Sequence, residues 1–440
     1  MSSFFLVKYV ILISRWIMSK IINVIGGGLA GSEASLYLAN HGYKVNLYEQ
    51  KPIKMSPAHH SEGLGELVCS NSLKSKKLDN ACGLLKEEMK YFSSIMMEAS
   101  SFSEVPAGNA LSVDRDLFSE YITNKIKNHP NITLISEEVI ELKKGINIIA
   151  TGPLTSDGLS KTLMTMLGQE HMYFYDAAAP IIEASSINMD IAYRKSRYDQ
   201  GDDSYINCPF TKEQYDIFYN ELINGQIASL HEFDKVFEGC MPIEVMAKRG
   251  EKTLRFGPLK PKGLEYNGNK PYAVLQLRQD NVSATLYNMV GFQTNLTYGE
   301  QKRIFSLIPG LENAKFVRYG LMHRNTFICA PKHLNPDFSL KEYPDVYVVG
   351  QLSGVEGYVE SAMSGLLCAV HLVRKLEGKE FKKMPNETIM GSLVNYICNA
   401  SIKGFAPMNA NFGIMMNLLK DREQVANRSI EALKKWIEEN

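Results

Sequence analysis

The sequence predicts an α/β protein in which a nucleotide-binding parallel sheet is interrupted by a second lobe. Three observations lead to this fold class. Residues 21–50 read as a strand, a Gly-rich turn, a helix and a second strand. Two further strand-and-glycine segments, 146–153 and 345–369, fit the rest of such a site and lie about 200 residues apart. Between them the pattern changes to short alternating runs, which are typical of an antiparallel sheet with helices.

The chain begins with an apolar stretch, FFLVKYVILISRWIM, that resembles a membrane segment. Lys8 and Arg15 leave only six uncharged residues between them, whereas a bilayer span needs about 20. A small-residue cleavage site is also missing. We therefore expect residues 1–18 to be a non-native or disordered extension, with translation starting at Met18. We expect no stable membrane association; a peripheral anchor is the alternative.

The turn after the first strand carries the spacing G-x-G-x-x-G. The first glycine permits a tight turn, the second lets a pyrophosphate approach the backbone, and the third lets helix and strand pack closely. The helix N-terminus brings partial positive charge to the phosphates. A glutamate ends the second strand, where its carboxylate can accept hydrogen bonds from a ribose. The expected contacts to a dinucleotide are Gly26, Gly27, Gly28, Leu29, Ala30, Gly31 and Glu49.

Two distant segments favour FAD over NAD as this dinucleotide. INIIATGP is a strand that runs into Ala-Thr-Gly, with Thr151 and Gly152 as expected contacts. DVYVVGQLSGVEGYVESAMSGLLCA is a strand, a glycine, a loop and a helix rich in small residues. Such a helix N-terminus stabilises the negative charge that builds up when a flavin is reduced. After Gly350 the usual Asp is replaced by Gln351, so this contact would be neutral. The sequence thus predicts an FAD-binding, Rossmann-like domain of the glutathione-reductase type.

We expect this FAD domain to be discontinuous, comprising residues 19–195 and 320–440, with an inserted α+β lobe at 196–319 that contacts RNA or substrate. The whole chain carries 48 basic and 48 acidic side chains. The inserted lobe nevertheless contains a run of cations with one acidic residue, Glu251, among them. Phosphate contacts are one interpretation of this run, and a solvated face is the other. The cations are Lys248, Arg249, Lys252, Arg255, Lys260 and Lys262.

Seven widely spaced cysteines indicate neither a disulfide framework nor a metal site, and they fit the reducing cytoplasm. Cys69 lies in ELVCSNSLKS, between an apolar pair and a polar run. Cys240 lies between a glycine and a Met-Pro pair, a turn-like context that can expose a thiol. A buried structural cysteine is the alternative for both. The other five are expected to be structural: Cys82, Cys208, Cys329, Cys368 and Cys398.

Together the motifs resemble those of the folate/FAD-dependent tRNA (uracil-5-)-methyltransferases. The similarity runs from about residue 20 to 430 and includes VIGGGLAGSEAS, PAHHSEGLGELVCSNSLKS, IIATGPLTS, EGCMPIEVMAKRG, MHRNTFI and GQLSGVEGYVESAMSG. The resemblance implies methyl transfer to C5 of a uridine, most simply T-loop U54 of tRNA. The methylene donor would be 5,10-methylenetetrahydrofolate, with electrons from NAD(P)H passing through FAD.

This chemistry gives a use for two thiols. Uracil C5 is a poor nucleophile until a thiolate adds to C6, and a base must later remove the C5 proton. By resemblance Cys240 is the better candidate for the nucleophile and Cys69 for the general base or its partner; the opposite allocation stays open. Nearby cations such as Lys248 or Arg249 would favour the thiolate. Tyr358 resembles the aromatic residue that stacks on the flavin ring, with a core tyrosine as the alternative.

Other functions remain open at this stage. A paralogue could perform the same chemistry on a 23S rRNA uridine. A related flavoprotein family builds aminomethyl groups on the tRNA wobble uridine, but that family is longer, with an additional helical C-terminal region. A catalytically silent RNA-binding flavoprotein is a further possibility, against which the retention of both Cys69 and Cys240 argues. Sequence does not decide between NADH and NADPH or fix the oligomeric state.

Overall fold

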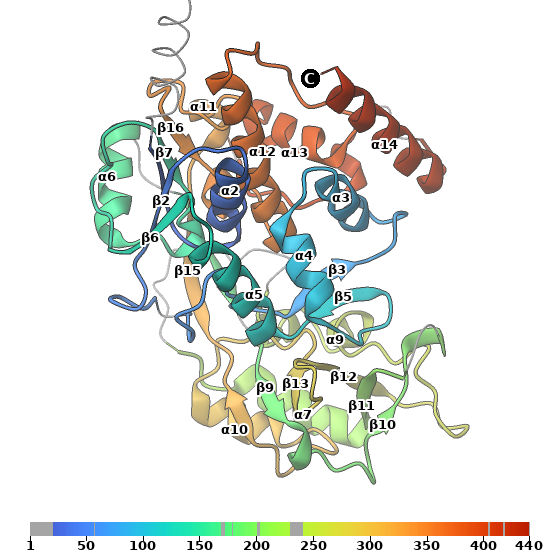
Figure 1. Ribbon diagram of the computed structural model, residues 1–440. Helices are drawn as coiled ribbons and strands as arrows, with labels where there is room; N and C mark the ends of the chain where they lie inside the picture. Colours follow the sequence, from blue (N-terminus) through green and yellow to red (C-terminus); the bar gives the residue numbers. More distant parts are fainter. Residues whose placement is uncertain are drawn as a thin grey trace, which may run out of the picture.

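The computed structural model describes residues 21–56, 58–168, 172–177, 179–199, 203–228, 241–403, 405–416 and 419–439. The expected N-terminal extension, residues 1–18, lies outside these ranges. The described chain forms two lobes, drawn one above the other in Figure 1. Each lobe has its own hydrophobic core, and residues from both ends of the chain build the core of the upper lobe.

The upper lobe is built on a five-stranded sheet with the order β16-β7-β1-β2-β6. Every neighbouring pair in it is parallel. Its three central strands are almost entirely buried, because helices cover a parallel sheet on both faces. The strands are β1 (Ile22–Ile25), β2 (Val45–Glu49), β6 (Ile132–Ser136), β7 (Asn147–Ile149) and β16 (Val346–Val348).

Two helices that are far apart in sequence pack closely beside this sheet (Figure 1), α2 (Leu29–Asn40) and α12 (Tyr358–Leu376). Their contact depends on Gly365, since a Cβ at this position would lie 2.0 Å from the carbonyl oxygen of Ala30. α2 follows β1 and α12 follows β16, so both helices begin at the carboxyl edge of the sheet. This is the edge at which open α/β sheets bind ligands.

Further helices and a small sheet complete the upper lobe. The helices are α3 (Ala81–Lys90), α4 (Ile95–Phe102), α5 (Arg115–Lys127), α6 (Asp157–Leu167), α11 (Ala330–His333), α13 (Ile389–Asn399) and α14 (Arg422–Glu438). The small sheet has the order β3-β5-β4 and consists of β3 (Ser72–Ser75), β4 (Glu104–Val105) and β5 (Ala110–Val113).

Two buried carboxylates join these helices. Glu33 on α2 accepts a hydrogen bond from the hydroxyl of Ser94 at the start of α4. Glu88 on α3 accepts from the backbone N–H groups of Ile389 and Met390, each at 2.8 Å, at the start of α13. A carboxylate can therefore cap a helix that is distant in sequence. Burial raises the pKa of both Glu33 and Glu88 to about 7.

These raised values predict a pH-dependent stability. Because the folded-state pKa of Glu88 is about 7 against an ordinary 4.5, its protonated form contributes stability below pH 4.5 that is lost as the pH rises through 7. The loss is on the order of 3 kcal/mol. Glu88→Gln should flatten the decline of unfolding free energy between about pH 5 and pH 8, measured by urea unfolding. An unchanged slope in the variant would contradict the assignment.

The lower lobe is built on an antiparallel six-stranded sheet with the order β10-β11-β12-β13-β9-β14. The strands are β9 (Ile181–Glu183), β10 (Tyr193–Arg194), β11 (Tyr205–Phe210), β12 (Ala273–Gln279), β13 (Leu286–Met289) and β14 (Phe316–Arg318). Its helices are α7 (Lys212–Asn224), α8 (Ile243–Ala247), α9 (Thr253–Phe256) and α10 (Tyr298–Phe305). β9 and β10 precede residue 196, so this sheet begins earlier than the expected lobe boundary.

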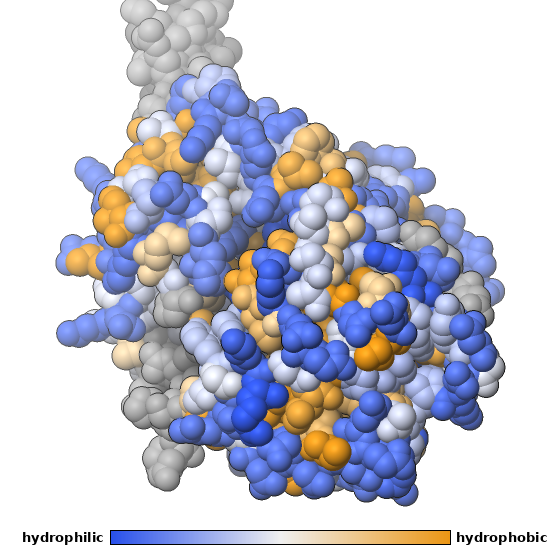
Figure 2. Space-filling view, turned by 90° about the horizontal axis from the view of Figure 1, so that it is seen from below, coloured by the Kyte–Doolittle hydropathy of each residue, from blue (hydrophilic) through white to orange (hydrophobic). Residues whose placement is uncertain are grey.

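An antiparallel pair, β8 (Met172–Ala177) and β15 (Met322–Phe327), carries the chain into and out of the lower lobe. The α/β fold with an inserted α+β lobe is therefore confirmed. Seen from below, the molecule is largely hydrophilic, with isolated hydrophobic patches (Figure 2). Within the described ranges no helix has the length and apolar character required to cross a bilayer.

Candidate active site

A cavity of about 370 Å³ opens at the carboxyl edge of the parallel sheet. It brings together segments from both halves of the upper lobe, as the sequence predicts for a split dinucleotide site. Of the predicted site residues, the cavity is lined by Gly26, Gly28, Leu29, Ala30, Glu49, Cys69, Thr151, Gly152, Gly350, Gln351 and Tyr358. Gly27 lies in the same turn, Gly31 lies in the first turn of α2, and Cys240 lies outside the described residues.

Close backbone contacts define the turn between β1 and α2. Gly26 has a positive φ of 105°, and a Cβ there would meet the carbonyl oxygen of Ala150 at 2.6 Å. A Cβ on Gly31 would lie 1.8 Å from the oxygen of Gly26. By contrast, a Cβ on Gly28 would find no atom within 4 Å. Gly26 and Gly31 therefore close the turn, and Gly28 leaves its backbone accessible to a ligand.

Glu49 at the end of β2 fixes this turn through its carboxylate. One oxygen accepts from the backbone N–H of Gly27 at 2.8 Å, and the other accepts from that of Lys51 at 3.0 Å. A carboxylate has about four acceptor positions, so capacity for a ribose hydroxyl remains. Gly152 follows β7, which lies across β1 from β2, and like Gly28 it has open space where a Cβ would stand. The two open glycines and the two helix N-termini fit a dinucleotide.

Two glycine substitutions should separate folding from cofactor binding. Gly31→Ala must displace the Gly26 carbonyl, so we expect it to lower the unfolding free energy of the cofactor-free protein by about 1–3 kcal/mol or more. Gly28→Ala should leave that stability within about 0.5 kcal/mol yet weaken dinucleotide binding. Thermal unfolding of the stripped protein and flavin titration measure the two effects. Equal behaviour of the two variants would contradict this division of roles.

Cys69 lies in the cavity against the hydroxyl of Tyr358, which opens α12. The Sγ–Oη distance is 3.0 Å. The same Tyr358 oxygen accepts from the backbone N–H groups of Cys69 at 2.7 Å and Ser70 at 3.2 Å. Because these two bonds occupy both lone pairs, the hydroxyl proton is left to point at the sulfur. Burial and the neighbouring Cys69 raise the pKa of Tyr358 well above its ordinary value, so the hydroxyl stays protonated and donates.

The segment after Cys69 is held from the lower lobe. Asn71 is fully buried and donates to the carbonyl oxygens of Val113 at 3.0 Å and Gln279 at 2.9 Å. Arg278 on β12 donates to the Asn71 side chain at 2.9 Å and to the Ser70 hydroxyl at 2.8 Å. The position of the thiol therefore depends on the contact between the two lobes.

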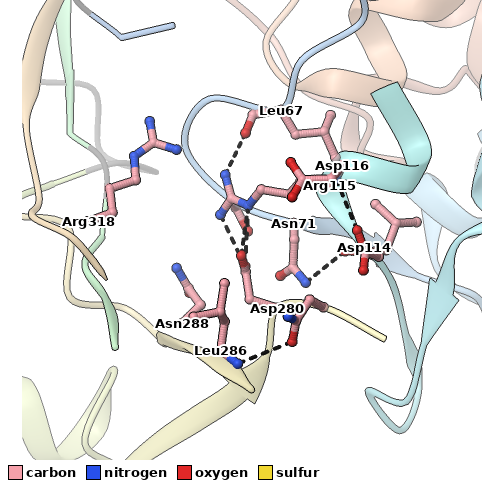
Figure 3. Close-up of polar contacts among 12 residues, drawn as sticks. Leu67, Asn71, Asp114, Arg115, Asp116, Asp280, Leu286, Asn288 and Arg318 are labelled. Carbon is pink, nitrogen blue, oxygen red and sulfur yellow. Dashed lines mark hydrogen bonds and ion pairs between the residues drawn. The ribbon is translucent and has the colours of Figure 1, made fainter. Parts of the chain in front are cut away.

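A buried ion pair reinforces this contact (Figure 3). Arg115, the first residue of α5, pairs with Asp280 just beyond β12 at 3.2 Å, with side chains 11% and 4% exposed. The same guanidinium donates to the carbonyl oxygen of Leu67, two residues before Cys69. Arg318 lies across from Arg115 in Figure 3, and both cations interact electrostatically with Cys69.

Sequence reasoning missed several residues of this site. Lys74 and Glu360 line the cavity and form an ion pair of 2.9 Å, and Glu360 also accepts from the backbone N–H of Ala410. Lys74 belongs to the NSLKS run, but nothing in the sequence links it to a glutamate 286 positions away. The Arg115–Asp280 pair, separated by 165 positions, is equally invisible. Pairs of residues so far apart in the chain leave no helical or strand periodicity in the sequence from which their contact could be predicted.

Residues shortly after Cys240 come close to the cavity. The backbone N–H of Ile243 donates to the carbonyl oxygen of Gln293 at 2.7 Å, and Gln293 lines the cavity. α8 thus begins beside the site. Of the basic run, Lys248, Arg249, Lys252 and Lys262 are exposed, whereas Arg255 and Lys260 are partly buried.

Comparison with known proteins gives the family. The model of the family "Glucose inhibited division protein A" matches residues 21–380. Proteins named methylenetetrahydrofolate–tRNA-(uracil-5-)-methyltransferase TrmFO match almost the whole chain. The Listeria monocytogenes protein is 55% identical over 96% of this chain and 100% of its own length. The chain belongs to the TrmFO family.

Other TrmFO proteins match equally well. That of Ligilactobacillus salivarius is 53% identical over 95% of this chain and 99% of its own length. That of Bacillus subtilis is 53% identical over 94% of this chain and 97% of its own length. Among solved structures, Aquifex aeolicus GidA has a TM-score of 0.67 and 16% identity, covering 94% of this chain and 73% of that one. This likeness confirms the predicted Rossmann-like fold of the FAD-binding type for this TrmFO chain.

Proposed function

We propose that this protein transfers a one-carbon unit from 5,10-methylenetetrahydrofolate to C5 of a uridine in tRNA, T-loop U54. FAD and NAD(P)H provide the reducing equivalents. The observation that carries the proposal is the Cys69 thiol, which lies in the same cavity as the glycine turn. Relatives named for this activity share more than half of the residues over nearly the full chain.

The cavity residues divide into two groups that would hold FAD. The turn from Gly26 to Gly31, Glu49 and the Thr151–Gly152 turn would bind the adenosine and pyrophosphate part. Gly350, Gln351 and the N-terminus of α12 would bind the flavin part. The Gln351 amide donates to Glu356 at 2.6 Å, so its orientation is fixed. When bound, FAD supplies the two electrons that bring the transferred carbon to the methyl level.

Two thiols supply the chemistry at the base. Cys240 adds as a thiolate to C6 of uracil, which makes C5 nucleophilic, and Cys69 removes the C5 proton. The Tyr358 hydroxyl stabilises a Cys69 thiolate by pointing its proton at Sγ. Arg115 and Arg318 add positive charge near the same sulfur. Proton removal follows formation of the bond between C5 and the one-carbon unit; the Cys69 thiol then holds the proton, and expulsion of the Cys240 thiolate from C6 restores the C5–C6 double bond.

A reconstitution assay tests the proposal. The purified protein is incubated with FAD, NADH or NADPH, methylenetetrahydrofolate and either a tRNA or a 23S rRNA transcript, followed by nucleoside analysis. We expect 5-methyluridine in the tRNA, and its loss when U54 is replaced by cytidine. Product only in the rRNA would assign the protein to a paralogue with another target. Product in neither RNA would refute the methyltransferase assignment.

A further inference from the structure

The short helices α8 and α9 present an unusual surface. Phe256 at the end of α9 is 79% exposed, more than any other large apolar side chain among the described residues. It borders an open hollow that is also lined by Met241, Met246, Arg249 and Lys252. With the neighbouring Lys248 these residues form what we call the α8–α9 surface. An exposed aromatic ring beside several cations offers a stacking face together with positive charge, the combination that binds single-stranded nucleic acids.

Buried residues of α8 and α9 anchor this surface to the core of the lower lobe. Glu244 on α8 is 1% exposed and accepts from the Thr294 hydroxyl at 2.8 Å and the backbone N–H of Asn295 at 2.7 Å. Leu254 on α9 is fully buried. Arg255 turns inward, where its guanidinium stacks 3.6 Å above the Tyr272 ring. Phe256 is therefore exposed on an ordered support and not because its helix lacks a core.

The charge of the surface is one-sided. Lys248, Arg249 and Lys252 are exposed. The acidic residue among them, Glu251, accepts a hydrogen bond from the Tyr272 hydroxyl at 3.2 Å. The chain as a whole has no net charge, so this local excess of cations gives a polyanion a preferred place to dock.

The surface also adjoins the candidate active site. Met241 lines the hollow and directly follows Cys240 in the chain. Two residues later, Ile243 is bonded to Gln293, which lines the cavity that contains Cys69. A ligand on the α8–α9 surface would therefore lie close to Cys240 and to the cavity that contains Cys69.

We propose that the α8–α9 surface docks the single-stranded loop of the substrate RNA. Lys248, Arg249 and Lys252 contact its phosphates, and Phe256 stacks on an unpaired base next to the target uridine. Proteins recognise RNA loops by stacking splayed bases on aromatic side chains, and every base offers such a face. The inference rests on the proposed function for the identity of the RNA. We favour RNA over a protein partner or a second copy of the chain, because docking of a protein would not require the three cations around Phe256.

Aromatic substitutions test the stacking contact. We expect Phe256→Ala to raise the Kd for tRNA, and the KM in methylation, about tenfold, because stacking contributes about 1–3 kcal/mol per base. Phe256→Trp should restore both. The matched control is Phe102→Ala, since Phe102 is 61% exposed on α4 of the other lobe and should bind tRNA like the wild type. Wild-type affinity in Phe256→Ala would overturn the proposal.

A salt titration tests the phosphate contacts. Lys252→Ala should reduce the slope of log Kd against log salt concentration by about 0.7, whereas Lys127→Ala, an exposed cation on α5, should leave it unchanged. Equal slopes would overturn the phosphate assignment. If Phe256→Ala changes the sedimentation coefficient but not RNA affinity, the surface is a protein interface and the proposal fails. Wild-type protein that binds tRNA through Phe256 without methylating it would refute the proposed function only.

Discussion

Replacing Cys69 with alanine is expected to lower the rate of 5-methyluridine formation by about 10²- to 10⁴-fold, the usual contribution of a general base. The sulfur lies 3.0 Å from the Tyr358 hydroxyl in the cavity that would hold the flavin, so its loss removes the proton acceptor without touching the glycine turn. Flavin content should therefore remain normal. Single-turnover methylation and the absorbance of the purified protein measure the two properties.

Two further variants make this result specific. Cys398→Ala removes a thiol that is 8% exposed and lies in α13, and methylation should persist. Cys240→Ala should also abolish methylation with flavin retained, because the nucleophile is lost. A Cys69→Ala protein that methylates at the wild-type rate would show that the base is another group. If only Cys240→Ala loses covalent attachment to the RNA, Cys240 is the nucleophile.

Replacing Asp280 with alanine is expected to destabilise the protein by about 3–5 kcal/mol, since it leaves Arg115 buried without its carboxylate partner. The effect should reach the active site, because Arg115 also holds the carbonyl of Leu67 and so the loop that leads to Cys69. We expect a fall in melting temperature on the order of 10 °C together with slower methylation. Differential scanning calorimetry and the nucleoside assay provide the readouts.

An exposed ion pair offers the matched control. Glu104 pairs with Lys76 at 2.7 Å, and both side chains are more than 40% exposed, so Glu104→Ala should change the melting temperature little. Asp280→Asn keeps a hydrogen-bond acceptor near Arg115 and should fall between the wild type and Asp280→Ala. If the Asp280 and Glu104 variants melt alike, the buried pair does not hold the lobes together.

Local sequence signals located segments that the structure brings together around one cavity. The glycine spacing at Gly26, Gly28 and Gly31 depends on steric demands within one turn, which a short stretch of sequence records. The segments ending at Thr151 and Gly350 were found for the same reason. The lobe boundary was harder to place, because β9 pairs with β13 and β14, which lie more than 100 positions later in the chain. Alternation alone does not say with which sheet a short strand pairs.

The surroundings of Cys69 could not be predicted in this way. Tyr358, Arg278 and Asp280 approach it from positions more than 200 residues away. Tyr358 was singled out for its resemblance to a flavin-stacking residue, yet its hydroxyl proved to be the direct partner of the thiol. Arg115 and Asp280 each end a segment that resembles the family, but nothing in either segment indicates that the two side chains pair.

The sequence by itself determined the dinucleotide turn, the family and the two candidate thiols, because each is encoded in contiguous residues whose spacing has a steric or chemical reason. Only the tertiary structure decided what surrounds Cys69: a tyrosine hydroxyl from α12, a guanidinium and a backbone carbonyl from β12, and a buried ion pair between the lobes. These contacts arise where distant segments pack together, and packing is set by the whole chain.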